Sequence, residues 1–244
     1  MLKQKLFVMT ALVVALILGF QANSFALGGG KKRQAKFTVR IENISAADGL
    51  TAQDGSRYPF ALSPGMFVLT ENKTDFFKVG KKAGEGLEAQ AEDGNPESLA
   101  KRLLTKIGSA NMGVFNMPTG ADKPAPILPS GSYEFTFTAE EGMKLNLVAM
   151  FGQSNDLFYA PARAIGLFED GKALSGDITD KFMLYDAGTE VNQAPGIGDV
   201  QAPRQKSPNT GAAENGVVRL IEDVKDGFDY PKTKDVLRIT ISHS

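Results

Sequence analysis

Two short segments carry the side chains best suited to binding an ion. The segment "YDAGTEVN" (185–192) holds Asp186 and Glu190 four residues apart, around a small and flexible centre. Thirty residues upstream of Asp186, "GQSNDLFY" carries Asn155 and Asp156 just after a predicted strand. Calcium takes about six to eight oxygen ligands from carboxylates, amides, carbonyls and water, and two close carboxylates repel unless a cation lies between them. The spacing permits a calcium site, although an ordinary solvated turn also explains these residues, because Asp and Gly are common in turns.

Other chemistries find less support in the composition. The chain has no cysteine and one histidine, His243, which lies one residue from the end on a predicted strand. Thiol catalysis, disulfides and a zinc site with the usual ligands are therefore excluded, and a frayed strand end is a poor place for a positioned catalytic base. Paired carboxylates could hydrolyse a polysaccharide, but such clefts are lined with aromatic rings, and the chain has no Trp and only five Tyr.

The first residues predict export. Lys3 and Lys5 precede an apolar run from Leu6 to Phe20, and a small-residue pattern ends at Ala26. This is the layout of a signal peptide, and the run is short for a membrane-spanning helix. We therefore expect a signal peptide over 1–26, a flexible basic leader over 27–35 and one domain over 36–244, in the periplasm or secreted, with no membrane span after cleavage.

The charge of the exported chain is close to neutral. Without Lys3 and Lys5 it carries 25 basic and 28 acidic side chains, a net charge of −3. This balance indicates no nucleic-acid partner, and the "KKR" cluster at 31–33 is read as part of the leader.

Period-two alternation predicts most of the secondary structure. It marks strands at 36–45, 133–139, 144–151, 180–186 and 235–244, with a weaker one at 163–168. The turn "EEG" at 140–142 predicts a hairpin between the second and third of these strands. We expect a mostly β protein, an antiparallel β-sandwich whose end loops can hold ligands.

Two segments depart from the strand pattern. In "NPESLAKRLLTKIG", Asn95 can cap a helix, Gly108 can end it, and the apolar residues recur at helical spacing, so we expect one short helix over about 97–107, packed on the sheet. The segment 192–217 is rich in Pro and Gly and predicts a long loop within one domain.

Three segments resemble a known family in their order along the chain. "AGEGLEAQAEDGN" (83–95), "GQSNDLFYAPARAIGLF" (152–168) and "YDAGTEVN" (185–192) resemble signature segments of the spondin N-terminal (F-spondin-type) domain, most closely its secreted bacterial members. The resemblance runs from about Lys36 to Ile241. It implies a β-sandwich similar to C2 domains and a Ca²⁺ site formed by Asp156, Asp186 and Glu190. Glu190 stands where the family more often has Asp.

Together these observations predict a secreted, calcium-binding β-sandwich module that is not an enzyme. It would bind an unknown extracytoplasmic protein or glycan in adhesion or at the cell envelope. Two alternatives stay open, a polysaccharide hydrolase that uses the loop carboxylates and a purely structural envelope protein. The cysteines and thrombospondin repeats of the animal relatives are missing, so their matrix roles do not transfer automatically.

Overall fold

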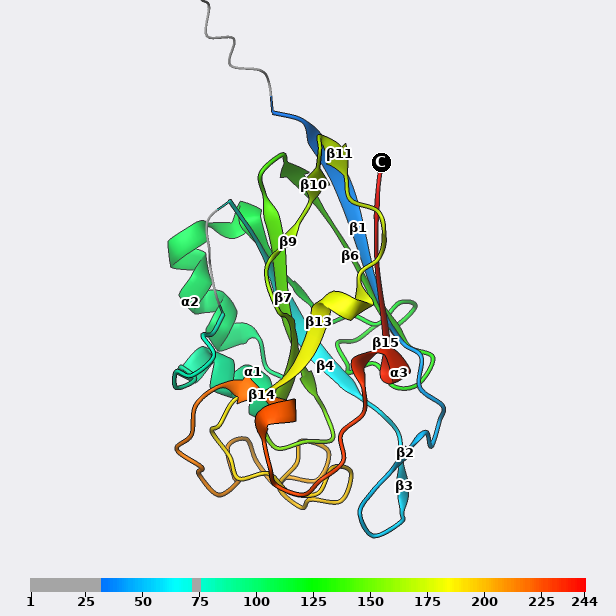
Figure 1. The fold of residues 1–244 in the computed structure, drawn as a ribbon, viewed down its shortest axis with the longest axis vertical. Helices are drawn as coiled ribbons and strands as arrows, with labels where there is room; N and C mark the ends of the chain where they lie inside the picture. The colour runs from blue at the N-terminus through cyan, green and yellow to red at the C-terminus, as the bar shows by residue number, and fades with distance from the viewer. Residues whose placement is uncertain (1–31, 72–75) are drawn as a thin grey trace, which may run out of the picture. The chain divides into compact units, whose positions relative to one another are not determined.

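The computed structural model describes residues 32–71 and 76–244 (Figure 1). The predicted signal peptide and the start of the basic leader lie outside the described residues. The end of the leader belongs to the domain, because β1 (Gln34–Asn43) begins at Gln34, which pairs with Glu140. Within the described residues, none of the helices has the length and apolarity that a membrane crossing requires.

Two antiparallel sheets form the framework. The four-stranded sheet has the order β12-β15-β1-β6 and contains, besides β1, the strands β12 (Gly176–Asp177), β15 (Leu237–His243) and β6 (Ser132–Glu140). The seven-stranded sheet has the order β14-β13-β8-β7-β4-β5, with β9 also paired to β7; its strands are β14 (Arg219–Leu220), β13 (Phe182–Asp186), β8 (Leu157–Pro161), β7 (Lys144–Phe151), β4 (Leu62–Thr70), β5 (Met112–Phe115) and β9 (Ile165–Gly166).

Smaller elements complete the fold. Two short ribbons pair β2 (Leu50–Thr51) with β3 (Arg57–Tyr58) and β10 (Phe168–Glu169) with β11 (Lys172–Ala173). The helices are α1 (Glu85–Asp93), α2 (Glu97–Ile107) and α3 (Thr233–Val236), with 3₁₀ turns η1 (Ser109–Asn111), η2 (Thr179–Lys181) and η3 (Ile221–Asp223).

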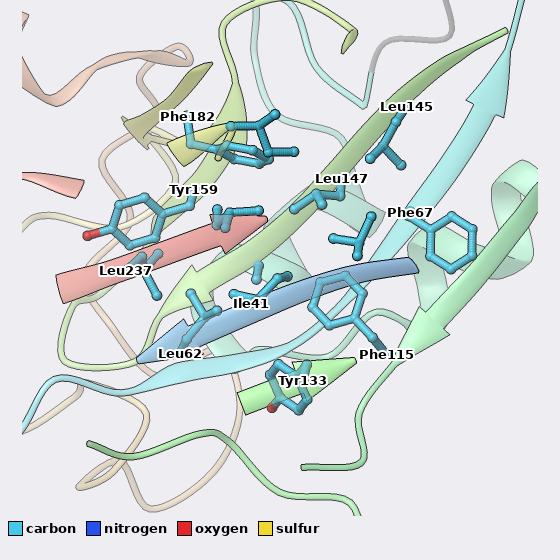
Figure 2. Packing of buried hydrophobic residues seen from close by; sticks show 14 of the residues in the cluster. Ile41, Leu62, Phe67, Phe115, Tyr133, Leu145, Leu147, Tyr159, Phe182 and Leu237 are labelled. Atoms are coloured by element: carbon cyan, nitrogen blue, oxygen red, sulfur yellow. The ribbon is translucent and has the colours of Figure 1, made fainter. Parts of the chain in front are cut away.

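The main core lies between the two sheets. Alternate residues of each strand point inward, so Ile41 of β1 meets Leu147 of β7 and Tyr159 of β8 in one apolar cluster (Figure 2). Burying such side chains stabilises a fold by about 1.5–3 kcal/mol each relative to exposure. The structure thus confirms the predicted mostly β, antiparallel sandwich.

A second apolar layer covers the outer face of the seven-stranded sheet. The alternate residues there, such as Val68, Val148 and Phe158, pack against Leu87 of α1 and Leu103 of α2. A strand buried on both faces has apolar residues at nearly every position, so its sequence does not alternate between apolar and polar residues. For this reason β4 and β8 were not predicted from the sequence. Helix α1 was also not predicted.

Helix α2 confirms the predicted helix and its ends. The side chain of Asn95 accepts a hydrogen bond from the amide N–H of Glu97 at 3.0 Å. At the other end Gly108 has a φ of 74° and donates its N–H to the carbonyl of Leu104 at 3.1 Å. Such capping satisfies groups that have no partner inside the helix.

The predicted hairpin between β6 and β7 is wrong. The tight turn is present, with Gly142 at a φ of 98°, but β6 pairs with β1 in one sheet while β7 pairs with β4, β8 and β9 in the other. The turn therefore joins the two sheets across the core. Both edges of β7 are taken by other strands, so no edge remains for β6.

Candidate metal centre

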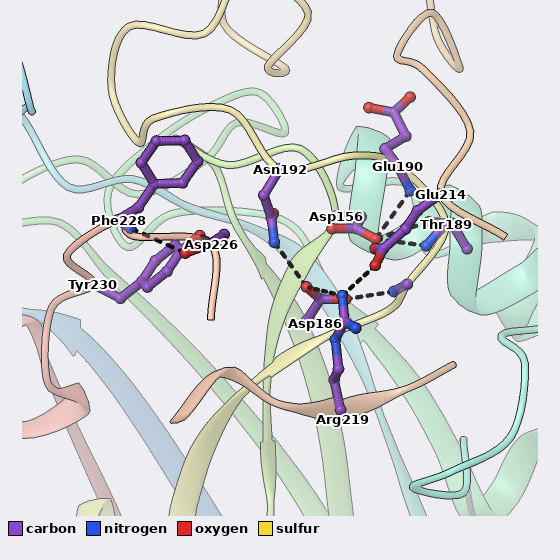
Figure 3. Close-up of polar contacts among 11 residues, drawn as sticks. Asp156, Asp186, Thr189, Glu190, Asn192, Glu214, Arg219, Asp226, Phe228 and Tyr230 are labelled. Carbon is purple, nitrogen blue, oxygen red and sulfur yellow. Dashed lines mark hydrogen bonds and ion pairs between the residues drawn. The ribbon is translucent and has the colours of Figure 1, made fainter. Parts of the chain in front are cut away.

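Two neighbouring strands bring the predicted aspartates together. Asp186 is the last residue of β13 and pairs with Leu157, the first residue of β8. Asp156 directly precedes that residue in sequence, so its side chain lies beside Asp186 at one end of the sandwich (Figure 3). Both aspartates are fully buried.

The loop after β13 wraps around Asp156. One carboxylate oxygen, Oδ2, accepts the backbone N–H of Thr189 at 2.7 Å, that of Glu190 at 3.2 Å and the hydroxyl of Thr189 at 3.2 Å. The other oxygen, Oδ1, is buried and has no hydrogen-bond partner. A buried polar atom without a partner is costly, so Asp156 offers one free ligand atom.

Asp186 has partners on both oxygens. Oδ1 accepts the N–H of Gly188 at 2.7 Å, and Oδ2 accepts the side chains of Asn192 at 2.8 Å and Arg219 at 3.3 Å. Gly188 has a φ of 69°, and a Cβ there would lie 2.6 Å from the backbone nitrogen of Val217. Glycine is thus required at the centre of the "DAGTE" turn.

The third nearby carboxylate is that of Glu214, in the long loop. Ligand oxygens of Asp156, Asp186 and Glu214 all lie within 4.8 Å of one another. The backbone holds Glu214 in place, because its N–H donates to the carbonyl of Thr189 at 2.9 Å. One carboxylate oxygen pairs with Arg219, while Oε2 is buried without a partner.

Glu190 does not join this cluster. Its backbone contacts Asp156, but its carboxylate points away from the aspartates (Figure 3). That carboxylate accepts the N–H of Gly211 at 2.8 Å and the side-chain amide of Asn155 at 3.3 Å. The structure therefore brings two of the three predicted ligands together and places Glu214 where Glu190 was expected.

Electrostatics disfavour the charged forms of both aspartates. Burial, and then the negative charge of Asp186, raises the pKa of Asp156. Burial also raises the pKa of Asp186, while Arg219 acts against that shift. Three carboxylates and one guanidinium leave a formal charge of about −2 when all are ionised, so a divalent cation would neutralise the cluster.

The sequence carried little local signal for Glu214 and Arg219. Glu214 lies in an ordinary polar loop, and Arg219 is in a two-residue strand, β14, that pairs with Asp186. Glu214 and Arg219 come close to the aspartates because the long loop turns back along Glu190. Glu190 and Ala213 form an isolated β-bridge there.

His243 is exposed at the end of β15, as the sequence indicated.

Comparison with protein-family models found no match for this chain, and comparison with curated proteins found none either.

Proposed function

We propose that this protein is a non-enzymatic binding module in which one calcium ion, held by Asp156, Asp186 and Glu214, ties together the loops at one end of the sandwich. The observation that carries the proposal is the pair of buried carboxylate oxygens without partners, Asp156 Oδ1 and Glu214 Oε2, within one cluster. Native proteins rarely leave buried polar atoms unsatisfied, and a bound cation would satisfy both.

The oxygen spacing fits calcium. Calcium–oxygen bonds are about 2.3–2.6 Å long, so two oxygens on one ion lie at most about 5.2 Å apart. The three carboxylates meet this limit with ligand atoms within 4.8 Å of one another. Calcium also prefers oxygen donors, which is all that this cluster offers. Water and backbone carbonyls would complete the coordination.

Burial of the carboxylates supports a binding role over hydrolysis. A glycoside hydrolase must bring its general acid to the glycosidic oxygen. Asp156 and Asp186 are both 0% exposed, so a sugar chain has no direct access to them. The ion would act on loop order and not on a substrate.

The resemblance to spondin N-terminal domains supports the same proposal. In that interpretation the exported module binds an extracytoplasmic protein or glycan through loops that the calcium ion orders. The family's ligand pattern would be changed here, with Glu214 in place of Glu190.

Calcium-dependent stability tests this proposal. A ligand that binds only the folded state raises stability by RT ln(1 + [Ca]/Kd). Extracellular modules bind calcium with a Kd of about 10⁻⁴–10⁻³ M, so about 10 mM calcium should add about 1.4–2.7 kcal/mol. Asp186→Asn and Glu214→Gln should each lose most of this gain in thermal denaturation, whereas Asp229→Asn, at an exposed acid, should keep it.

Two results would oppose the proposal. If the melting temperature of the unmodified protein is the same in calcium and in chelator, the cluster holds no calcium. If the gain survives in both cluster variants, the ion binds elsewhere. Glu214 is only half-buried in a loop, so its variant should fold even if Asp186→Asn does not.

A further inference from the structure

One asparagine of the long loop has the sequence context of a residue that modifies itself. Asn215 is the only asparagine of the chain that is followed by glycine. Its side chain is exposed, and no residue of the described chain holds its amide by a hydrogen bond. Its φ is 60°, in the left-handed region. It directly follows Glu214, the third carboxylate of the metal centre.

An Asn–Gly pair can deamidate without an enzyme. The backbone nitrogen of Gly216, once a solvent base has taken its proton, attacks the side-chain carbonyl carbon of Asn215. A new C–N bond closes a succinimide ring, and the side-chain nitrogen leaves as ammonia. Water then opens the ring at either carbonyl, which gives aspartate or isoaspartate. Glycine favours the attack because it has no side chain to crowd the nitrogen.

The fold holds the attacking nitrogen in place. The N–H of Gly216 donates to the carbonyl of Gly188 at 2.7 Å, so this bond must break before the nitrogen can attack. On the other side of Asn215, the N–H of Glu214 donates to the carbonyl of Thr189 at 2.9 Å (Figure 3). Both neighbours of Asn215 are thus bonded to the "DAGTE" turn, and the reaction requires the segment 214–216 to detach from it.

The same close packing explains why glycine follows Asn215. A Cβ at position 216 would lie 3.1 Å from the carbonyl oxygen of Gly188 and 3.2 Å from Cδ of Glu214. Both contacts are tighter than side chains usually accept, because protein interiors leave little free space. The return of the loop over the turn therefore favours glycine at 216, and the reactive pair is a consequence.

We propose that Asn215 is a deamidation site and that the ion of the metal centre restrains its reaction. The restraint by the ion rests on the calcium-binding function proposed above, whereas the restraint by the fold does not. Calcium bound to Glu214 holds the residue directly before Asn215, so the segment 214–216 detaches only after the ion has left. Loss of calcium then permits an irreversible change beside the cluster.

Deamidation would alter the metal centre itself. Both products carry a new carboxylate next to Glu214, and isoaspartate also adds one methylene to the backbone between Glu214 and Arg219. Since Arg219 is held in β14 by its pairing with Asp186, the longer backbone shifts Glu214 relative to the aspartates. The protein would then retain a permanent chemical mark of time spent without calcium.

Peptide mapping by mass spectrometry tests the proposal on protein stored in calcium, in chelator, and in urea with chelator. Modification at Asn215 should be fastest in urea, slower in chelator and slowest in calcium. With about 10 mM calcium and a Kd of about 10⁻⁴–10⁻³ M, the ion-free fraction falls by about tenfold to a hundredfold. The reaction rate should fall by the same factor, because it follows the population of the opened loop.

The long loop supplies a matched control within the same sample. Asn209 is also exposed and has a φ of 54°, but it is followed by Thr210, whose branched side chain hinders the attack. It should stay unmodified under all three conditions. Asn215→Gln should abolish the reaction at 215, because the longer side chain closes a ring less readily. This variant should keep the calcium-dependent melting temperature, since the side chain at 215 is not part of the cluster.

The two proposals fail separately. If the melting temperature rises with calcium but Asn215 reacts equally fast in calcium and in chelator, the restraint by the ion is wrong and the calcium proposal stands. If the melting temperature ignores calcium but Asn215 reacts more slowly in chelator than in urea, the restraint by the ion is wrong together with the calcium proposal, and the restraint by the fold is confirmed. If Asn215 is unmodified even in urea, it is not a deamidation site.

Discussion

At the scale of single residues, the metal centre is a balance between carboxylates and one guanidinium. Arg219 contacts both Asp186 and Glu214, and it occupies oxygens that a cation would also attract. Its Nε is buried without a hydrogen-bond partner. We therefore expect Arg219 to stabilise the ion-free fold and to weaken ion binding.

Arg219→Gln should separate these two effects. Removing the positive charge makes the cluster more negative, so calcium should bind about tenfold more tightly, or about 1.4 kcal/mol. In chelator the same variant should be less stable, because Asp186 and Glu214 lose a charged partner. Calorimetric titration and thermal denaturation measure the two quantities, with Arg102→Gln on the exposed face of α2 as the control. Weaker calcium binding by the Arg219 variant would mean that the guanidinium organises the ligands instead of competing with the ion.

At the scale of elements, the seven-stranded sheet needs α1 and α2 to cover its outer face. The apolar face of α2 is narrow: Leu103 is 1% exposed, whereas its neighbour Leu104 is 48% exposed. Since Leu103 packs in the outer apolar layer with Leu87, the helix is bound to the sheet through a few side chains.

Adjacent leucines provide a matched test of this packing. Leu103→Ala should lower the free energy of unfolding by about 2–5 kcal/mol, because it leaves a cavity in the layer. Leu104→Ala should change it by less than about 0.5 kcal/mol, as is usual at exposed positions. Urea denaturation of both variants measures the difference. Equal losses at the two positions would show that α2 does not pack by this face in solution.

At the scale of the whole molecule, the sandwich brings distant segments to one end. The β8–β13 pairing places Asp156 beside Asp186, and the chain from 187 to 218 then returns with Glu214 before β14 pairs with β13. Loops gathered at the end of a rigid sandwich are a common place for binding. A cation there would order the loop that the proposed partner meets.

Export from the cytoplasm is the last prediction that concerns the whole molecule. The charged start, the apolar run and the small residues up to Ala26 predict cleavage that leaves Leu27 as the first residue. The intact mass of the protein recovered outside the cytoplasm measures this directly. Full-length protein held in the inner membrane would identify the segment as an anchor.

The sequence by itself determined the parts of the fold that depend on local pattern. The alternation of apolar and polar residues predicts β1, β13 and β15. The cap at Asn95 and the glycine at 108 predict the ends of α2. Each of these signals lies within or next to the element that it specifies. The oxygen donors Asp156 and Asp186 stand out because they follow or end recognisable strands, but it was the resemblance to spondin N-terminal domains that implied that they share an ion.

Only the tertiary structure decided which elements and side chains meet. The turn at 140–142 has the sequence of a hairpin, yet β6 and β7 belong to different sheets, because strand partners are set by the edges that remain free. Glu190 and Glu214 are both acids near the motif, and the path of the long loop turns the first toward Gly211 and the second toward the aspartates. Such contacts join residues far apart in the chain, so their identity depends on the packing of the whole domain and leaves little trace in local sequence.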